Sequence, residues 1–599
     1  MKSRRDDLPA SLPSLWRSLK LGYRAEPRLL LVSFGLTLAA ALPDALFALW
    51  LKLLTTGVVD HHRDEVFVAT LGLGGSAAAS WCLKIVGDRV QRRFRDRATI
   101  AIEAHVARLQ ASVAGIEHHE RPEYLDRLPV LRDQVFALNH LYMSIFGVAG
   151  WVLRLGVTVA LLMSIHPALA LLALFALPTV IVSSSRSAAE REAEERGAQH
   201  NRRARHLFTL GTTASPGKEV RVTGIGPRLV EDRREAWERW YGPVAAVRWG
   251  TAIWQSAAWA IFGAAYVGAI VFVASGLGAP AGDVVLVLAA GARLSQYLGA
   301  TVGEVGFLRG IWLDSARRLA WLEDYAAAFH ETADQPAPER IERDIRFEDV
   351  SFRYPGTDRM VLENVSLELP AGAVVAIVGE NGAGKTTLVK LLCRFYEPTM
   401  GRISVDGADI ARMPVEEWRS CFAGAFQDFF RFEFEARHTV GLGDLPRIDD
   451  RPAVAIAVDR AGAGDLVDRL GHGLDTQLGP TWHEGVDVSF GQWQKLALAR
   501  GFMRDDPLVL VLDEPTAALD AETEHALFER YAAATRDGGA GAGGRITILV
   551  SHRFSTVRMA DLIVVLDGSN VVEVGSHEEL LARNGQYAEL YSIQAAAYR

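Results

Sequence analysis

The octapeptide GENGAGKT, from Gly379 to Thr386, has residue types and spacing that suit the binding of phosphates. It fits the pattern G-x-x-x-x-G-K-[ST], follows the apolar stretch AVVAIVG and precedes a stretch that is typical of a helix. Glycines allow backbone N–H groups to wrap phosphate oxygens at a helix N-terminus. Lys385 is expected to reach the β and γ phosphates, and the Thr386 hydroxyl to ligate Mg²⁺. The predicted contacts to a nucleoside triphosphate are Gly379, Glu380, Asn381, Gly382, Ala383, Gly384, Lys385, Thr386 and Thr387.

Two carboxylates stand at the end of another apolar stretch, LVLVLDEP, which runs from Leu508 to Pro515. Asp513 is placed to hold the magnesium shell, and Glu514 can orient and deprotonate the attacking water. The plainer interpretation is that two acids cap a strand and take no part in catalysis. The phosphate loop upstream favours the first interpretation, so the sequence predicts nucleotide hydrolysis.

The elements that must position these residues alternate between strand-like and helix-like stretches. IRFEDVSFRY and VVAIVG are typical of strands, and TTLVKLL of the start of a helix. Such alternation predicts a mainly parallel α/β domain of the P-loop NTPase class over residues 344–599. A polar, proline-containing stretch at 329–343 has no apolar periodicity and is expected to be a linker.

The composition of the whole chain indicates a membrane part beside the soluble part. Hydrophobic residues make up 49% of the 599 residues, and the mean hydropathy is +0.11, which fits a chain that is part membrane and part soluble. A membrane span needs roughly 20 mainly apolar residues. We therefore predict an all-α transmembrane domain over residues 1–328, with six spans at about 29–51, 66–86, 141–165, 168–185, 249–274 and 284–309.

The loops between these spans fix the expected topology. The short loops contain few basic residues, whereas the long loops at 87–140 and 186–248 and the N-terminus are rich in arginine. Basic loops stay on the cytoplasmic side, so the N-terminus, the long loops and the soluble domain are predicted to be cytoplasmic. The long loops have helix-like sequences, which predicts long cytoplasmic extensions of the spans.

Charged residues inside the predicted spans are costly and need an explanation. Arg154 and Arg293 fall near mid-depth, while Asp44 and Glu304 lie nearer the ends of their spans. One interpretation is an intramembrane ion pair that fixes helix packing. The other is that the arginines line a cavity and attract anionic or amphipathic cargo.

Composition excludes two other classes of site. The net charge of −8 argues against a protein that binds nucleic acid through bulk positive charge. The three cysteines, at positions 82, 393 and 421, lie too far apart for a metal-ligand pattern or a disulfide framework.

Further motifs occur in a fixed order around the phosphate loop, and together they carry a family resemblance. The soluble half resembles the nucleotide-binding domain of ABC transporters, and the whole chain is similar to a half-size ABC exporter. The resemblance implies that Tyr354 stacks on adenine, that Gln427 senses Mg²⁺, and that His552 contacts the γ-phosphate. It also implies that Asp520 contacts the partner of a dimer and that VSFGQ is the signature, with Ser489, Gly491 and Gln492 facing the partner's ATP.

Phe490 departs from the family pattern, because the signature usually reads LSGGQ and has glycine at this position. Ser489 and Gly491, which the phosphate contact needs, are present. We expect a working signature if the phenylalanine side chain points away from the phosphate. A ring that reorients the Ser489 backbone would instead leave a chain that binds ATP without rapid turnover.

The resemblance implies an ATP-hydrolysing transporter of the inner membrane that requires ATP and Mg²⁺. It would act as a dimer with itself or with a similar half-transporter. An exporter of an amphipathic or hydrophobic small molecule, lipid or peptide is the first interpretation. An importer of a siderophore or vitamin with the exporter fold, a membrane ATPase without cargo and a soluble ABC ATPase are the alternatives. The six apolar spans count against the last, and the cargo itself stays open.

Overall fold

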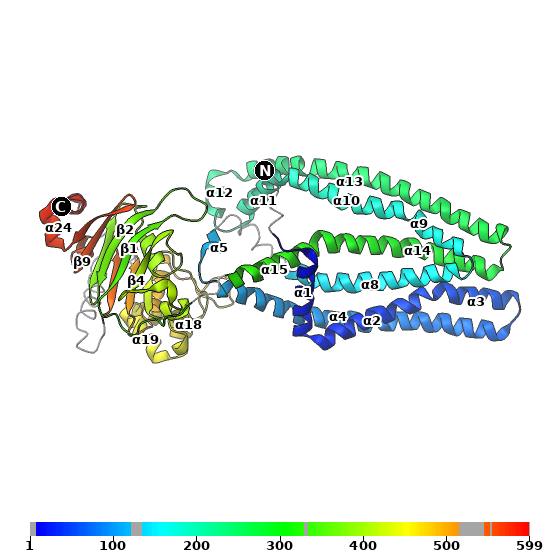
Figure 1. Cartoon of the computed structure of the whole chain (residues 1–599), viewed down its shortest axis with the longest axis horizontal. Helices are drawn as coiled ribbons and strands as arrows, with labels where there is room; N and C mark the ends of the chain where they lie inside the picture. Colours follow the sequence, from blue (N-terminus) through cyan, green and yellow to red (C-terminus); the bar gives the residue numbers. More distant parts are fainter. Residues whose placement is uncertain (1–7, 121–134, 329–332, 514–543, 552–553, 598–599) are drawn as a thin grey trace. The chain divides into compact units, whose positions relative to one another are not determined.

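The computed structural model describes residues 8–120, 135–328, 333–513, 544–551 and 554–597. The chain divides into two compact units, one formed by Met1–Ser112 and Asp126–Ala327 and the other by Val113–Leu125 and Ala328–Arg599. The first, called here the helical unit, is built from long helices (Figure 1). The second, called here the sheet unit, combines two sheets with short helices.

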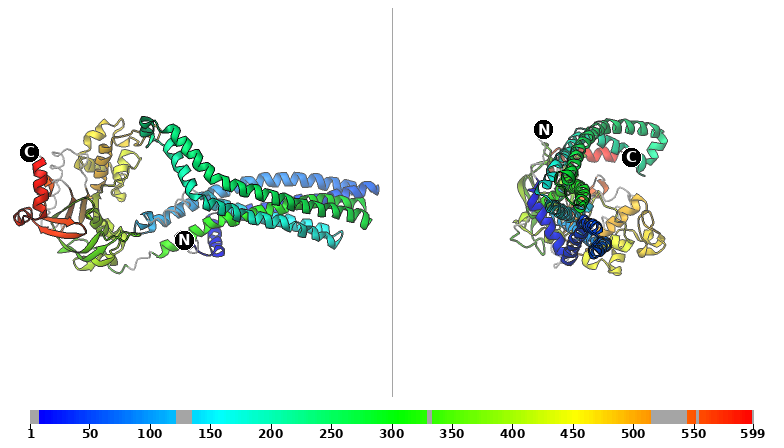
Figure 2. Two further views of the ribbon diagram at one scale, coloured as in Figure 1. Left: turned by 90° about the horizontal axis from the view of Figure 1, so that it is seen from above. Right: turned by 90° about the vertical axis from the view of Figure 1, so that its right-hand side faces the viewer.

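The helices of the helical unit pack lengthwise against one another (Figures 1 and 2). Helix α2 packs on α4 and α8, α14 packs on α3 and α8, and α13 packs on α10 and α11. The helices are α1 (Ser11–Ala25), α2 (Pro27–Ala45), α3 (Phe47–Val59), α4 (Arg63–Ser112), α8 (Val135–Met163), α9 (Leu171–Phe175), α10 (Leu177–Arg196), α11 (Ala198–Thr212), α12 (Gly217–Thr223), α13 (Gly226–Val271), α14 (Ala281–Phe307) and α15 (Leu313–Ala328).

Five helical stretches in the described part of the chain are long and apolar enough to cross a membrane. They are Pro27–Val59, Arg63–Ser112, His140–Met163, Gly226–Gly276 and Ala281–Phe307. A shorter apolar helix, Pro167–Ser183, falls where the fourth span is predicted. Five of the predicted spans thus overlap helices of sufficient length, and the fourth span remains a prediction.

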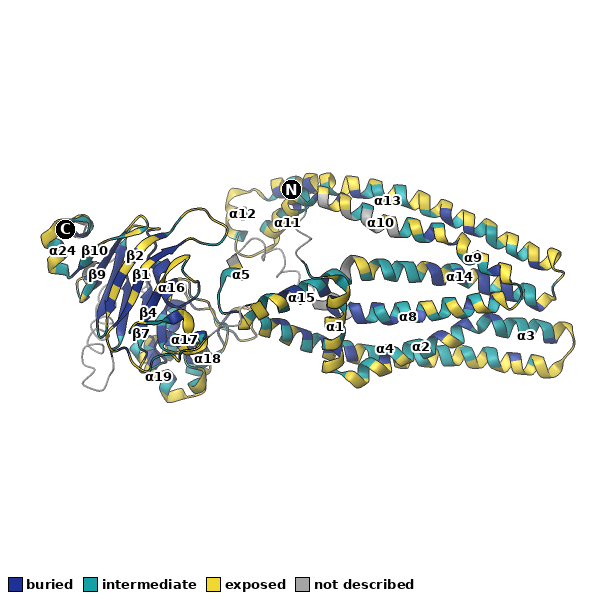
Figure 3. Ribbon diagram, viewed as in Figure 1, coloured by how far each residue is buried: buried dark blue, intermediate teal, exposed yellow. Residues whose placement is uncertain are grey.

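Large apolar side chains remain exposed along these helices, whose outer surfaces are coloured yellow and teal in Figure 3. On α13, Trp249 is 74% exposed and Trp254 is 69% exposed, and on α4 Phe67 is 66% exposed. Contiguous apolar surface of this kind is unfavourable in water and favourable against lipid chains. The exposed faces therefore suit a lipid environment.

Asp44 joins three helices of this unit, and we call it with Arg154, Arg293 and Tyr297 the Asp44 cluster. The Asp44 carboxylate accepts a hydrogen bond from Arg154 Nε at 3.0 Å and from the Tyr297 hydroxyl at 2.9 Å. Arg293 forms an ion pair with the same carboxylate and donates to the Asp44 backbone oxygen at 2.7 Å. The geometry favours the ion-pair interpretation, in which one carboxylate of α2 holds arginines from α8 and α14.

The other predicted intramembrane acid, Glu304 of α14, accepts a hydrogen bond from the Ser144 hydroxyl of α8. Both acids therefore connect α14 to a neighbouring helix through a polar contact. Polar contacts of this kind fix the register of helices that apolar packing alone leaves free to slide.

The sheet unit contains a four-stranded antiparallel sheet, with strand order β2-β1-β4-β5, and a six-stranded sheet, with order β10-β9-β3-β8-β7-β6. In the larger sheet, neighbouring strands from β9 to β6 run parallel, and only β10 is antiparallel to its neighbour. The strands are β1 (Asp344–Phe352), β2 (Leu362–Pro370), β3 (Val374–Gly379), β4 (Met400–Val405), β5 (Ala408–Asp409), β6 (Phe422–Ala425), β7 (Val509–Asp513), β8 (Ile546–Val550), β9 (Leu562–Asp567) and β10 (Asn570–Gly575).

The helices of the sheet unit are short. They are α5 (Glu117–Glu120), α16 (Lys385–Leu392), α17 (Val415–Ser420), α18 (Ala436–Gly441), α19 (Arg451–Arg460), α20 (Gly464–Arg469), α21 (Phe490–Gly501), α23 (Phe554–Val557), α24 (His577–Arg583) and α25 (Gln586–Ala597). Helices α18, α19 and α21 pack together over a second apolar cluster that includes Val440, Val454 and Leu496. This helical group carries the predicted signature.

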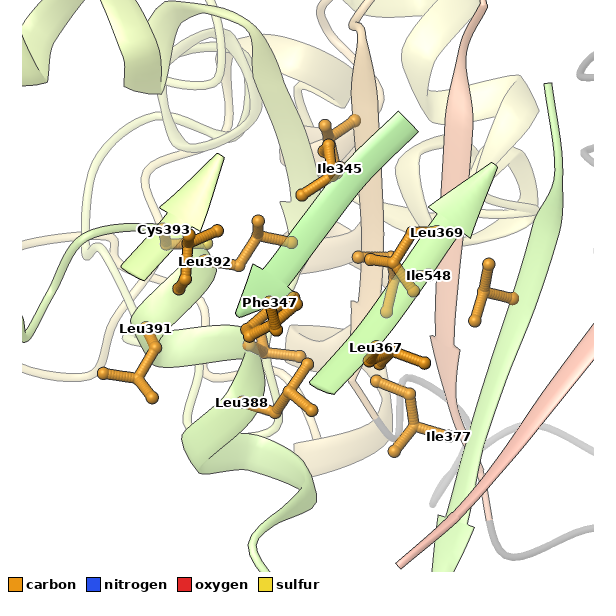
Figure 4. Close-up of a cluster of buried hydrophobic side chains, with 14 of the residues drawn as sticks. Ile345, Phe347, Leu367, Leu369, Ile377, Leu388, Leu391, Leu392, Cys393 and Ile548 are labelled. Atoms are coloured by element: carbon orange, nitrogen blue, oxygen red, sulfur yellow. The ribbon is translucent and has the colours of Figure 1, made fainter. Parts of the chain in front are cut away.

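The main core lies between the two sheets and helix α16. Figure 4 shows Ile345, Phe347, Leu367 and Leu369 of the smaller sheet beside Leu388 of α16. Strand β7 is buried along its whole length, as expected for a parallel strand covered on both faces. Burial of this strand fixes the position of Asp513 at its carboxyl end, where it is 1% exposed.

Candidate nucleotide site

The phosphate loop connects β3 to α16, and its backbone requires glycine. Gly382 has φ +83° and Gly384 has φ +98°, in the region that disfavours other residues. A Cβ at Gly384 would lie 2.8 Å from the Leu362 side chain and 3.0 Å from the Val361 carbonyl oxygen. The loop can therefore approach β2 closely only because this position has no side chain.

Lys385 is folded inward over this loop. Its ammonium donates to the carbonyl oxygens of Gly379 and Glu380, both at 2.9 Å, and the residue is only 6% exposed. These acceptors are neutral, so an anionic phosphate is a stronger partner for the same ammonium. The arrangement holds a buried cation next to backbone amides that curl around a helix N-terminus, which suits a phosphate group.

A cavity of about 640 Å³ brings the sequence-predicted nucleotide contacts together. Tyr354, Gln427 and the phosphate loop all line it, with Asn381, Gly382, Gly384, Lys385, Thr386 and Thr387 as the loop residues. The Tyr354 hydroxyl is hydrogen-bonded to Thr387 Oγ1 at 3.0 Å, which fixes the ring beside the loop. Packing against Phe352 and Tyr396, with ring centroids 5.0 and 5.3 Å away, restricts the ring further. The volume suits a ligand of nucleotide size.

Three lining residues were not expected from the sequence: Arg359, Val361 and Ser569. Arg359 and Val361 follow Tyr354 closely in the same loop. Their closeness to Tyr354 in the sequence could therefore have indicated that they line the same cavity. Ser569 lies in the turn between β9 and β10, and its backbone oxygen accepts from the Glu363 amide at 2.8 Å. Only the folded sheet brings this turn to the cavity.

The residues predicted to hold Mg²⁺ have suitable chemistry. Thr386, Gln427 and Asp513 all offer oxygen atoms, which Mg²⁺ prefers. Within the described ranges, no group of three His, Cys, Asp or Glu side chains could hold a metal by itself.

The predicted signature lies at the start of α21. Ser489 is the N-cap: its hydroxyl accepts from the Gln492 amide at 3.4 Å, and the Gln492 side chain accepts from the Ser489 amide at 2.7 Å. Phe490 is the first helical residue, is 55% exposed and does not have a positive φ. A phenylalanine is therefore compatible with this backbone, and Ser489 keeps the conformation of a helix cap.

The ring of Phe490 lies against the segment that follows Gln427. Its centroid is 5.3 Å from that of Phe429, and the Arg431 guanidinium carbon is 5.5 Å from it. Contacts of these two kinds are each worth about 0.5–1.5 kcal/mol. The side chain is thus held by its own domain. The remaining predicted site residues, Glu514, Asp520 and His552, lie outside the described residues.

Comparison with known proteins tests the resemblance to ABC transporters. The family model described as ABC transporter matches residues 362–517, which include the phosphate loop, the signature and both carboxylates. A solved bacterial Atm1-family ABC exporter, determined with ATP bound, superposes with a TM-score of 0.74 and 25% identity. That superposition covers 97% of this chain and 98% of the exporter. The phosphate-binding half thus matches the ABC transporter family model, and the whole chain has the fold of an ABC exporter. The predicted family and fold class, a helical membrane domain followed by an α/β ABC ATPase domain, are confirmed.

Two curated relatives of this transporter are named ATP-dependent lipid A-core flippase. The protein from Ralstonia nicotianae is 42% identical over 260 residues, and the one from Pseudomonas aeruginosa is 39% identical over 255 residues. Each match covers 43% of this chain, and 42% and 40% of the respective relatives. The matches thus span less than half of the relatives' length, and cargo and partners do not follow from them.

Proposed function

We propose that this ABC transporter couples ATP binding and hydrolysis to export of an amphipathic or hydrophobic small molecule, a lipid or a peptide. One observation carries the proposal: Tyr354, the phosphate loop and Gln427 share one nucleotide-sized cavity. They do so in a chain whose other unit contains helices long enough to cross a membrane. We place the membrane domain at 1–328, the linker at 329–343 and the ATPase domain at 344–599.

The proposed chemistry uses the cavity as it stands. Tyr354 stacks on the adenine, and Lys385 exchanges the carbonyl oxygens of Gly379 and Glu380 for phosphate oxygens. Thr386, Gln427 and Asp513 would hold Mg²⁺, which would neutralise charge on the phosphates. Glu514 orients the attacking water and accepts its proton, while His552 contacts the γ-phosphate.

The signature implies that two protomers act together. Ser489, Gly491 and Gln492 of one protomer face the ATP in the phosphate loop of its partner, and Asp520 contacts that partner. The partner is a second copy of this chain or a similar half-transporter in the inner membrane. Closure of the ATPase domains around ATP turns the cargo cavity outward, and hydrolysis resets it. The N-terminus and both ATPase domains lie on the cytoplasmic side.

Transport can be tested in proteoliposomes that contain the purified chain. A fluorescent phospholipid is the first probe, followed by an amphipathic peptide and a lipophilic dye, and the Glu514→Gln variant is the control. ATP-dependent movement of a probe away from the ATPase side, absent in the variant, is the expected result. Movement towards that side instead supports the importer alternative. Hydrolysis that no probe alters, without movement of any probe, supports a membrane ATPase without cargo.

A further inference from the structure

Phe490 occupies a position where the family signature has glycine, and its ring makes specific contacts within its own domain. It makes a tilted ring contact with Phe429, and the Arg431 guanidinium lies over it, at the distances given above. Both partners belong to the segment that follows β6 and contains Gln427. A ring contact thus joins the first helical residue of the signature to this segment.

The same segment, Phe426–Arg431, lines two cavities. Gln427 lines the nucleotide cavity. Phe426, Asp428, Phe429 and Phe430 line a second cavity of about 340 Å³, together with residues of β6 and α21. A displacement of this short segment therefore changes both cavities at once.

The second cavity is also connected to residues 114–116, which belong to the sheet unit and lie in the first of the two long loops predicted from the sequence. The Arg419 guanidinium, which lines this cavity, donates to the Ala114 carbonyl oxygen at 2.6 Å. Phe395 of the same lining accepts from the Ile116 amide at 3.2 Å through its carbonyl oxygen. The rings of Phe395 and Phe426 are 6.1 Å apart. Loop residues 114–116, the segment and the signature are thus connected by successive contacts.

We infer that Phe490 is a positioning residue that ties the start of the signature helix to the segment containing Gln427. A glycine here would remove the ring contacts at the start of the helix, while Arg500 near the other end of the helix still donates to the Phe430 carbonyl oxygen at 3.4 Å. With the ring in place, a movement of the segment also changes the orientation of Ser489 and Gly491. A movement of loop residues 114–116 reaches these two residues through the segment. Because of Phe490, the signature contacts the partner's ATP only when loop residues 114–116 and the segment are correctly placed.

This inference rests on the proposed ATPase activity, but its first test does not require turnover. Hydrogen exchange is followed for a peptide covering 488–497 in the full chain in lipid nanodiscs without nucleotide. Phe429→Leu weakens the ring contact and is expected to speed exchange there by up to roughly tenfold. Phe434→Leu is the control, because Phe434 is a nearby phenylalanine whose ring contacts Phe432, with centroids 6.1 Å apart, and it is 47% exposed. Unchanged exchange in Phe429→Leu, or equal acceleration in both variants, overturns the inference.

The second test measures steady-state ATP hydrolysis in the same nanodiscs for Phe490→Leu, Phe429→Leu and the double variant. Each single change is expected to lower kcat by about tenfold, because a small misplacement of a signature is costly, and to leave the KM for ATP within twofold. The double variant should be no slower than either single one. Phe490→Tyr, which keeps the ring, should retain the natural kcat.

The Phe490→Gly variant distinguishes a phenylalanine that positions the signature from one that impairs the signature. The inference expects this reversion to the family residue to lower kcat as Phe490→Leu does. A raised or unchanged kcat, or independent effects of the two leucine substitutions, overturns it. If the natural chain hydrolyses no ATP while the exchange test succeeds, the proposed function fails and the positioning role stands.

Discussion

The Asp44 cluster contains half-buried cations and the phosphate loop contains a buried one, and the groups that accept hydrogen bonds from them differ. In the Asp44 cluster, two arginines share a carboxylate, and Arg293 also donates to a tyrosine hydroxyl and a backbone oxygen. In the phosphate loop, the Lys385 ammonium contacts the neutral carbonyl oxygens of Gly379 and Glu380. A carboxylate is a strong, permanent partner, whereas neutral carbonyls are easily replaced by an anion. The comparison indicates a structural clamp in the membrane domain and a ligand site in the ATPase domain.

The largest expected effect comes from removal of Lys385, whose carbonyl partners a phosphate can replace. Lys385→Ala should lower kcat for ATP hydrolysis by about a hundredfold or more, because it deletes a preorganised charge at the transferring phosphoryl group. Steady-state hydrolysis and equilibrium binding of ATP measure the loss. Arg402→Ala, which removes an exposed cation of β4 in the same unit, is the control. Equal activity of Lys385→Ala and the natural chain would mean that the loop does not bind phosphate.

The next largest effect is expected from the Asp44 cluster. Asp44→Asn should destabilise the membrane domain by about 2 kcal/mol, because it leaves two half-buried arginines without their carboxylate. Thermal unfolding in detergent should show a clear drop in Tm, with the affinity for ATP unchanged. Asp60→Asn, at an exposed helix end, is the control. An unchanged Tm with altered response to anionic cargo would instead favour the cavity-lining interpretation of the arginines.

A smaller effect is expected from the loop backbone. Gly384→Ala forces a Cβ against Leu362 and Val361 at a positive φ, so it should weaken ATP affinity by about tenfold. Gly372→Ala is a matched control, because its φ is +79° but a Cβ there meets nothing within 4 Å. If both variants bind ATP equally well, the close approach of the loop to β2 is unimportant for nucleotide binding.

The smallest effect is expected from Tyr297→Phe. The substitution removes a hydroxyl that donates to Asp44 at 2.9 Å and accepts from Arg293 at 3.3 Å, and leaves the ion pairs in place. The loss should be about 1 kcal/mol, visible as a modest decrease in Tm. Tyr241→Phe, at a more exposed tyrosine, should leave Tm unchanged. A Tyr297→Phe effect as large as that of Asp44→Asn would show that the hydroxyl, not the charge, holds the clamp.

The sequence predicted the ATPase domain better than the membrane domain, and the reason is the range of the interactions. The phosphate loop is defined by eight consecutive residues between a strand and a helix, so its local pattern was sufficient. Tyr354 and Gln427 could be placed in the same cavity only through the family resemblance. Ser569 was missed because a turn more than 180 residues from the phosphate loop reaches the cavity through sheet pairing.

In the membrane domain, hydropathy located the helices but not their polar contacts. Asp44, Arg154 and Arg293 were identified as intramembrane charges, yet their pairing joins residues 110 and 249 positions apart. Apolar periodicity contains no information about which helix faces which. Pairing could therefore be proposed only as one of two interpretations, and the folded bundle favours it.

The most direct test of the account is Mg²⁺-dependent ATP hydrolysis by this chain alone in lipid nanodiscs, measured beside the Glu514→Gln variant. The account predicts turnover in the natural chain, its loss in the variant, and retained ATP binding in both. Such a result would also show that a homodimer is competent and that a signature containing Phe490 works. Hydrolysis that persists in Glu514→Gln, or failure of the natural chain to bind ATP, would contradict the account.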